Sequence, residues 1–114
     1  MAFKVLGGVT TCVVGNCGMG AAPWQPATLM ARAFHPDNEV PEYEGYAGYF
    51  AHLSKSAATP NVAALLGHGT IRLSVMGVDD REPTSAEMNA MKYLFNEALD
   101  NGAAPRRSSN WRPR

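Results

Sequence analysis

Cysteine is scarce in this 114-residue sequence, which contains two, Cys12 and Cys17. Two cysteines do not make a disulfide framework, and a strand rise of about 3.3 Å per residue would hold these two too far apart for a bridge in an extended segment. Net charge is also lacking, because 10 acidic residues balance 10 basic ones. This balance gives no reason to expect nucleic acid or an anionic membrane as a partner.

Long hydrophobic runs are missing as well. No apolar run approaches the roughly 20 residues that span a bilayer, and the N-terminus lacks the layout of an export signal. We therefore expect a cytoplasmic protein. Apolar residues still make up 46% of the chain against 18% charged, which favours one small globular domain over a disordered chain.

The most informative stretch, residues 8–23, reads GVTTCVVGNCGMGAAP. Its residues 9–14 are β-branched, small or apolar, which is typical of a strand buried on both faces in a parallel sheet. Three glycines then surround Cys17 and allow a sharp turn with a close approach to the backbone. Cys17 thus follows the carboxyl end of a strand, where α/β proteins place their chemistry. We interpret Cys17 as a metal ligand in a hydrolase and Cys12 as a buried apolar cysteine.

A second unit repeats this design further along the chain. The apolar run over residues 62–66 predicts another buried strand, and GHG follows it, with His68 between two glycines. For residues 70–76 the periodicity fits a short strand as well as one or two helical turns. His68 fits two roles, a residue that orients substrate and a ring bonded to the backbone at a turn.

Two segments have the periodicity of amphipathic helices. Residues 42–56 carry aromatic side chains at helical spacing, which we expect to form a buried stripe. Residues 84–101 begin with a capping box of Thr84 and Glu87 and stop at Gly102. The apolar face of this second helix would consist of Met88, Met91, Leu94, Phe95, Ala98 and Leu99. Alternating strands and helices predict parallel strands, hence an α/β sheet or barrel with a third strand after Gly102.

Both strand-and-turn motifs resemble the N-acyl-D-amino-acid deacylases, the D-aminoacylases of the amidohydrolase superfamily. The second-strand signature of that family resembles GVTTCVVGNCGMGAAP. Its third strand and following turn resemble NVAALLGHGTIRLSVMG. The helix after that strand resembles REPTSAEMNAMKYLFNEALDNGA. The resemblance covers about residues 7–103. It implies a partial (β/α)8 TIM barrel made of the second and third βα units. It also implies zinc-dependent hydrolysis of a small-molecule partner, an N-acyl-D-amino acid, to a carboxylate and a D-amino acid.

The resemblance also implies roles for particular residues. In the family the cysteine of GNCG is a zinc ligand, which implies this role for Cys17, and the histidine of GHG places His68 near the same barrel mouth. Asn16 and Arg72 are further candidates for substrate binding, Asn16 through its amide and Arg72 through a bidentate contact with a carboxylate. Each has an alternative role: Asn16 would only adopt the turn conformation that asparagine tolerates, and Arg72 would make a surface ion pair. We assign no catalytic residue within the chain.

Several elements of the family have no counterpart in this sequence. They are the His-x-His pair of the first strand, the later zinc histidines and the catalytic aspartate. Where the family continues into a glycine- and serine-rich strand end, this chain reads APRRSSNWRPR. We therefore expect residues 1–103 to be a fragment of the barrel domain and residues 104–114 to be a basic, irregular tail that fits a shifted reading frame.

Other functions remain open on the sequence alone. Cys17 as a nucleophile with His68 as its base would make a cysteine amidase, although no third residue that orients the base is visible. The glycines suggest a phosphate-binding loop, but neither G-x-G-x-x-G nor G-K-[ST] is present. Another amidohydrolase acting on a C–N bond is a further alternative. The alternative that is not an enzyme is a truncated remnant or an interaction fragment with exposed strand edges.

Overall fold

A pair of parallel strands forms the centre of the fold. The structure is a computed structural model that describes residues 2–22, 32–33, 43–56 and 60–104. Strands β1 (Thr11–Val14) and β2 (Asn61–Ala64) are parallel, with Val14 opposite Ala64 at their carboxyl ends. Both predicted strands are confirmed, with slightly different ends. Because the two strands end level with each other, the turns that follow them begin at the same edge of the sheet.

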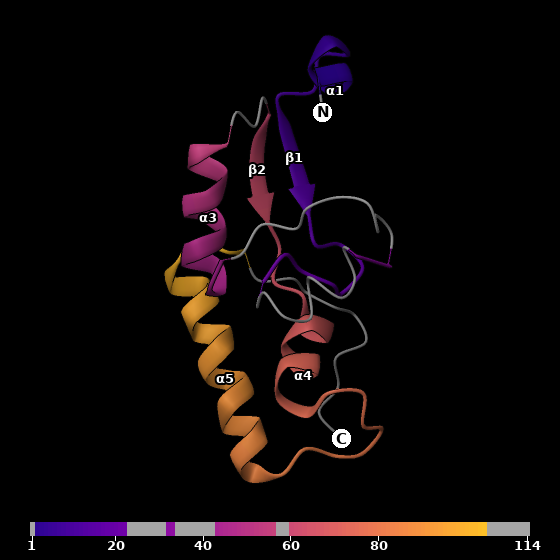
Figure 1. Cartoon of the computed structure of the whole chain (residues 1–114), viewed down its shortest axis with the longest axis vertical. Coiled ribbons are helices and arrows are strands. Elements are labelled where there is room, and N and C mark those ends of the chain that lie inside the picture. Colours follow the sequence, from indigo (N-terminus) through magenta and orange to yellow (C-terminus); the bar gives the residue numbers. More distant parts are fainter. Residues whose placement is uncertain (1, 23–31, 34–42, 57–59, 105–114) are drawn as a thin grey trace.

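The described helices are arranged around this pair (Figure 1). They are α1 (Ala2–Leu6), α3 (Gly45–Lys55), α4 (His68–Met76) and α5 (Ser85–Asp100). Helix α4 lies beyond the carboxyl ends of both strands, and α5 packs against α3 and α4. The segment for which periodicity left strand and helix open is therefore helical. Within the described part of the chain, no helix has the length and apolar character needed to cross a membrane.

A single residue, Ala104, pairs with the chain just past β2, on the side away from β1. Ala104 makes an isolated parallel bridge with Leu65. The N–H of Ala104 donates to the carbonyl of Ala64 at 2.8 Å, and the N–H of Leu66 donates to the carbonyl of Ala104 at 3.0 Å. Ala104 is therefore bonded to the main chain at the end of β2, and the boundary expected between residues 103 and 104 stays a prediction. Residues 105–114 lie outside the described residues.

The core lies where the helices meet the carboxyl half of the sheet. It consists of Ala22, Tyr46, Ala64, Leu66, Ile71, Ala98 and Ala103. Tyr46 is its largest member and is 1% exposed, while Tyr49 and Phe50 pack against the cluster. The predicted aromatic stripe of α3 is thus confirmed for these three side chains. Burial of this apolar surface is the main stabilising contribution to the fold.

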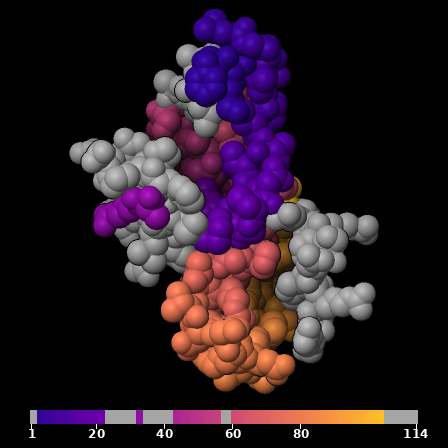
Figure 2. All heavy atoms as spheres, turned by 90° about the vertical axis from the view of Figure 1, so that its right-hand side faces the viewer, coloured from indigo at the N-terminus to yellow at the C-terminus, as the bar shows by residue number. Residues whose placement is uncertain are grey.

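Strand β1 is not buried on both faces, so that prediction is wrong. Thr11 and Val13 are exposed, Val13 to 53%, and Cys12 is only half-buried. Figure 2 shows the N-terminal segment, coloured indigo to violet, at the surface of the molecule. Among the described residues only β2 pairs with β1, and no described helix covers the Val13 side.

Phe95 of α5 also departs from prediction. It was expected on the buried face of this helix, but its side chain is 41% exposed.

Helix α5 begins at the predicted capping box. Thr84 Oγ1 accepts a hydrogen bond from the N–H of Glu87 at 3.3 Å, and the N–H of Thr84 donates to Glu87 Oε2 at 2.7 Å. The guanidinium of Arg81 donates to both oxygens of the same carboxylate. The start of α5 is therefore held by reciprocal side-chain and backbone bonds, the arrangement that satisfies free N–H groups at a helix terminus.

The pH dependence of unfolding should report this cap. Hydrogen bonds from Arg81 and then Thr84 lower the pKa of Glu87 well below its ordinary value of 4.5. The unfolded chain therefore takes up the proton first, and the stability contributed by ionised Glu87 is lost as pH falls below the unfolded pKa. In urea titrations between about pH 6 and about pH 3, we expect a smaller loss of stability for Glu87→Gln than for the wild type. Glu82→Gln is the matched control and should keep the wild-type slope. Equal slopes for Glu87→Gln and the wild type would contradict the prediction.

Candidate functional site

The turns that follow β1 and β2 meet at the carboxyl edge of the sheet. The N–H of Leu65 donates to the carbonyl of Val14 at 2.8 Å, which carries the pairing one residue past the strands. Further on, the N–H of Gly69 in the first turn of α4 donates to the carbonyl of Gly18, also at 2.8 Å. The structure therefore brings the two glycine-flanked motifs together between the strand ends and α4 (Figure 1).

Cys17 lies on the first of these turns, His68 is the first residue of α4 directly after the second turn, and both side chains are exposed. The ring of His68 lies against the backbone of Gly18, because a methyl group added to Gly18 would be 2.9 Å from His68 Cε1. The imidazole is therefore next to the residue that follows Cys17. The roles proposed for them, zinc ligand for Cys17 and substrate or supporting contact for His68, stay predictions.

For Asn16 and Arg72, the sequence left simpler alternatives to substrate binding, a tolerated turn conformation and a surface ion pair, and the described residues show neither. Asn16 does not take the left-handed conformation, which in this turn belongs to glycines such as Gly15, at φ 90°. Arg72 Nη2 donates to the carbonyls of Asp79 and Arg81 at 3.0 and 2.7 Å. Its guanidinium is thus held by main-chain oxygens, and among the described residues it makes no surface ion pair. Substrate binding by either residue stays a prediction.

The described residues do not by themselves form a zinc site. Nowhere in these parts of the chain do three or more His, Cys, Asp or Glu side chains come together as a group able to hold a metal. Zinc in hydrolases takes about three protein ligands and leaves a position for water. Cys17 offers one thiol of suitable chemistry, so the other ligands would have to come from elsewhere.

Tyrosine hydroxyls hold both turns from the side of α3. Tyr43 O–H donates to the carbonyl of Ala21 at 2.7 Å, and Tyr46 O–H donates to the carbonyl of Leu65 at 3.3 Å. Burial, with smaller contributions from Tyr49 and Tyr46, raises the pKa of Tyr43 to about 12. Burial likewise raises the pKa of Tyr46. Tyr43 therefore remains a protonated donor at neutral pH.

Thr70, in the first turn of α4, is a residue that the sequence analysis missed. Its side chain is completely buried, and Oγ1 accepts a hydrogen bond from the N–H of Gly20 at 2.6 Å. Thr70 directly follows the GHG motif, and a hydroxyl so close to a candidate site was the available signal. Tyr43 was missed as well, because nothing local in the sequence links it to a carbonyl 22 positions away.

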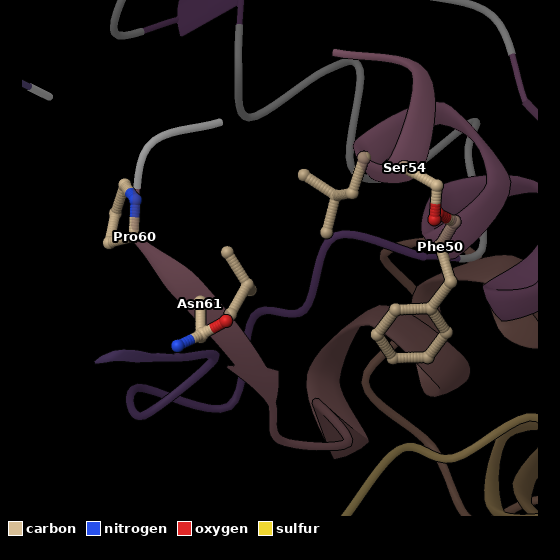
Figure 3. Close-up of a pocket in the computed structure, with 6 residues that line it drawn as sticks. Phe50, Ser54, Pro60 and Asn61 are labelled. Atoms are coloured by element: carbon tan, nitrogen blue, oxygen red, sulfur yellow. The ribbon is translucent and has the colours of Figure 1, made fainter. Parts of the chain in front are cut away.

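A separate depression lies at the other end of β2. It has a volume of about 260 Å³ and is lined by Phe50, Leu53, Ser54, Pro60, Asn61 and Val62 (Figure 3). Ser54 Oγ donates to the carbonyl of Phe50, and Asn61 Nδ2 donates to the carbonyl of Thr10. Its polar side chains are thus already bonded to the main chain. We therefore place the candidate site at the carboxyl edge of the sheet.

Comparisons with known proteins identify relatives of the whole described fold. The chain is 36% identical over 101 residues to N-acyl-D-glutamate deacylase and 38% identical over 104 residues to D-aminoacylase, both of Alcaligenes xylosoxydans xylosoxydans. The solved structure of N-acyl-D-glutamate deacylase from Bordetella bronchiseptica, with zinc and a phosphonate inhibitor, matches 90% of this chain at 36% identity and a TM-score of 0.72. The chain is homologous to one segment of the N-acyl-D-amino-acid deacylases. No family model matches it.

The homologous segment is a limited part of these deacylases. The two relatives match 89% and 90% of this chain, yet the chain spans only 21% and 22% of their length, and 22% of the solved structure. The α/β arrangement described above thus corresponds to part of a deacylase structure, and the predicted family resemblance is confirmed. The zinc and the inhibitor belong to the solved deacylase.

Proposed function

We propose that this segment forms the second and third βα units of a (β/α)8 barrel in a zinc-dependent N-acyl-D-amino-acid deacylase. The observation that carries the proposal is the match to a zinc-containing deacylase, at 36% identity and a TM-score of 0.72 over 90% of the chain. The parallel order of β1, β2 and the bridge at Ala104 supports it, because successive strands of such a barrel are parallel neighbours.

In this proposal Cys17 supplies one thiolate to the zinc ion, and His68 and Asn16 contribute to the substrate side of the same mouth. The exposed position of Cys17 at the carboxyl edge supports this role, since barrel enzymes place their sites there. In hydrolases of this kind, bound zinc activates water and polarises the scissile carbonyl. The segment's own contribution is to present the thiol and to hold its turn in place.

Exchange of this segment into a working relative would test the proposal. Residues 7–103 would replace the matching segment of the Alcaligenes N-acyl-D-glutamate deacylase. We expect the grafted deacylase to retain zinc, measured by metal analysis after dialysis, and to hydrolyse N-acetyl-D-glutamate. We expect negligible turnover from the 114-residue chain alone, because its described residues offer no complete set of metal ligands.

The matched control is the same relative carrying its own segment through the same cloning and purification steps. Circular dichroism and size-exclusion chromatography would establish that the grafted deacylase is folded. A folded graft that holds no zinc and has no turnover would contradict the proposal. Turnover by the 114-residue chain alone would contradict the expectation that it depends on ligands from elsewhere.

A further inference from the structure

The turn that carries Cys17 is anchored at three residues that follow it, Gly18, Gly20 and Ala21. Directly after Cys17, the carbonyl of Gly18 accepts the N–H of Gly69 at 2.8 Å. Three residues after Cys17, the N–H of Gly20 donates to Thr70 Oγ1 at 2.6 Å, and the Gly20 carbonyl lies 3.5 Å from the same hydroxyl. Thr70 thus binds both polar groups of one turn residue while its own side chain is fully buried.

A second side chain fixes the next residue of the turn from a different element. Tyr43, which lies just before α3, donates its hydroxyl proton to the carbonyl of Ala21 at 2.7 Å. Its ring stacks at a tilt with that of Tyr49, with ring centroids 5.4 Å apart, so its position is itself supported by packing. The turn is therefore held from the α4 side by Thr70 and from the α3 side by Tyr43.

We propose that Thr70 and Tyr43 are positioning residues that fix the Cys17 turn in place. This inference rests on the proposed role of Cys17 as a zinc ligand. A turn with three glycines has large backbone freedom, which folding must remove before a ligand can be held in one geometry. Metal ligands need placement within about 0.5 Å, and here the buried hydroxyl and the tyrosine supply that constraint.

Nuclear magnetic resonance on the full 114-residue chain tests this directly, without zinc or substrate. Thr70→Val keeps the shape of the side chain and removes the hydroxyl. We expect the Gly20 amide to exchange its hydrogen about tenfold faster, since an unmade buried hydrogen bond costs on the order of 1.4 kcal/mol. We expect the backbone order parameter of Cys17 to fall from about 0.85 to below about 0.6. The Leu65 amide, bonded to Val14, should be unaffected.

Two further variants at the same helix separate positioning from general stability. Thr70→Ser retains the hydroxyl and should restore both the Gly20 exchange rate and the Cys17 order parameter. Ser74→Ala removes a different hydroxyl from α4, one that donates to the Thr70 carbonyl, and should leave both values unchanged. A Cys17 order parameter that does not change in Thr70→Val would overturn the role of Thr70, even if Gly20 exchanged faster.

Tyr43→Phe is the second, independent variant and also covers the case in which Thr70→Val unfolds the chain. Global unfolding would show as faster exchange at Leu65 as well as at Gly20, and Tyr43→Phe would then decide. We expect it to lower the Cys17 order parameter while Leu65 keeps its protection. No change at Cys17 would overturn the inference. These measurements are independent of the deacylase role, which fails separately if the grafted deacylase lacks zinc.

Discussion

Replacing Cys17 by serine should abolish zinc binding in the grafted deacylase. A thiolate is a strong ligand for zinc, whereas a serine hydroxyl stays protonated and binds the ion poorly. Loss of even a supporting contact around a metal typically costs 10- to 100-fold in affinity or activity. For a direct ligand we expect hydrolysis of N-acetyl-D-glutamate to fall by at least about a hundredfold, with a parallel loss of zinc by metal analysis.

Cys12→Ser is the matched control for this experiment. Cys12 is the other free cysteine, and it is half-buried within β1 instead of on the turn. We expect this variant to keep its zinc and most of its turnover. If Cys17→Ser kept full zinc content and full turnover, the ligand role would be wrong. If Cys17→Ser kept zinc but lost turnover, the cysteine-nucleophile alternative would gain support, and trapping of an acyl-enzyme would test it.

Gly67→Ala should strongly destabilise the contact between the two turns at the candidate site. A methyl group at Gly67 would overlap the backbone nitrogen of Gly20 and lie 2.8 Å from the carbonyl oxygen of Gly18. The backbone angle φ of Gly67 is −85°, which alanine adopts freely, so the cost comes from packing alone. Because backbone atoms must move, we expect the free energy of unfolding to fall by about 3 kcal/mol, the upper end for overpacking.

Urea unfolding of the 114-residue chain measures this loss, and Gly7→Ala is the control. A methyl group at Gly7 would lie 3.4 Å from the carbonyl oxygen of Lys4, which is an ordinary contact. We expect that variant to stay within about 0.5 kcal/mol of the wild type. A Gly67→Ala chain as stable as Gly7→Ala would show that the two turns do not pack this closely.

The fold was predictable from the sequence where neighbouring residues decide the structure. The start of α5 follows from Thr84 and Glu87, three positions apart, and the apolar runs indicated both strands. Residues 70–76 were ambiguous because a short apolar segment has no clear period. In the structure they belong to helix α4, which packs against α5. The exposure of Val13 was not predictable, because it depends on which elements cover β1.

The location of the candidate site was predictable from the sequence, but the contacts that hold its residues in place were not. Glycines around Cys17 and His68 marked two turns after strands, and the parallel register places these turns at one edge. The partners of Arg72 were not predictable, since they are main-chain carbonyls whose positions depend on the path of the α4–α5 loop. The part played by Thr70 was hidden for a similar reason, because its partner lies 50 positions away.

The sequence by itself therefore determined the two strands, the helix of α5 with its cap, and the pair of glycine-flanked motifs that carry Cys17 and His68. The tertiary structure decided which faces of β1 are covered and which side chains anchor the Cys17 turn. The physical reason is the range of the interactions. Helix capping and strand propensity act between residues a few positions apart, whereas burial and the bond from Gly20 to Thr70 exist only once distant segments pack together.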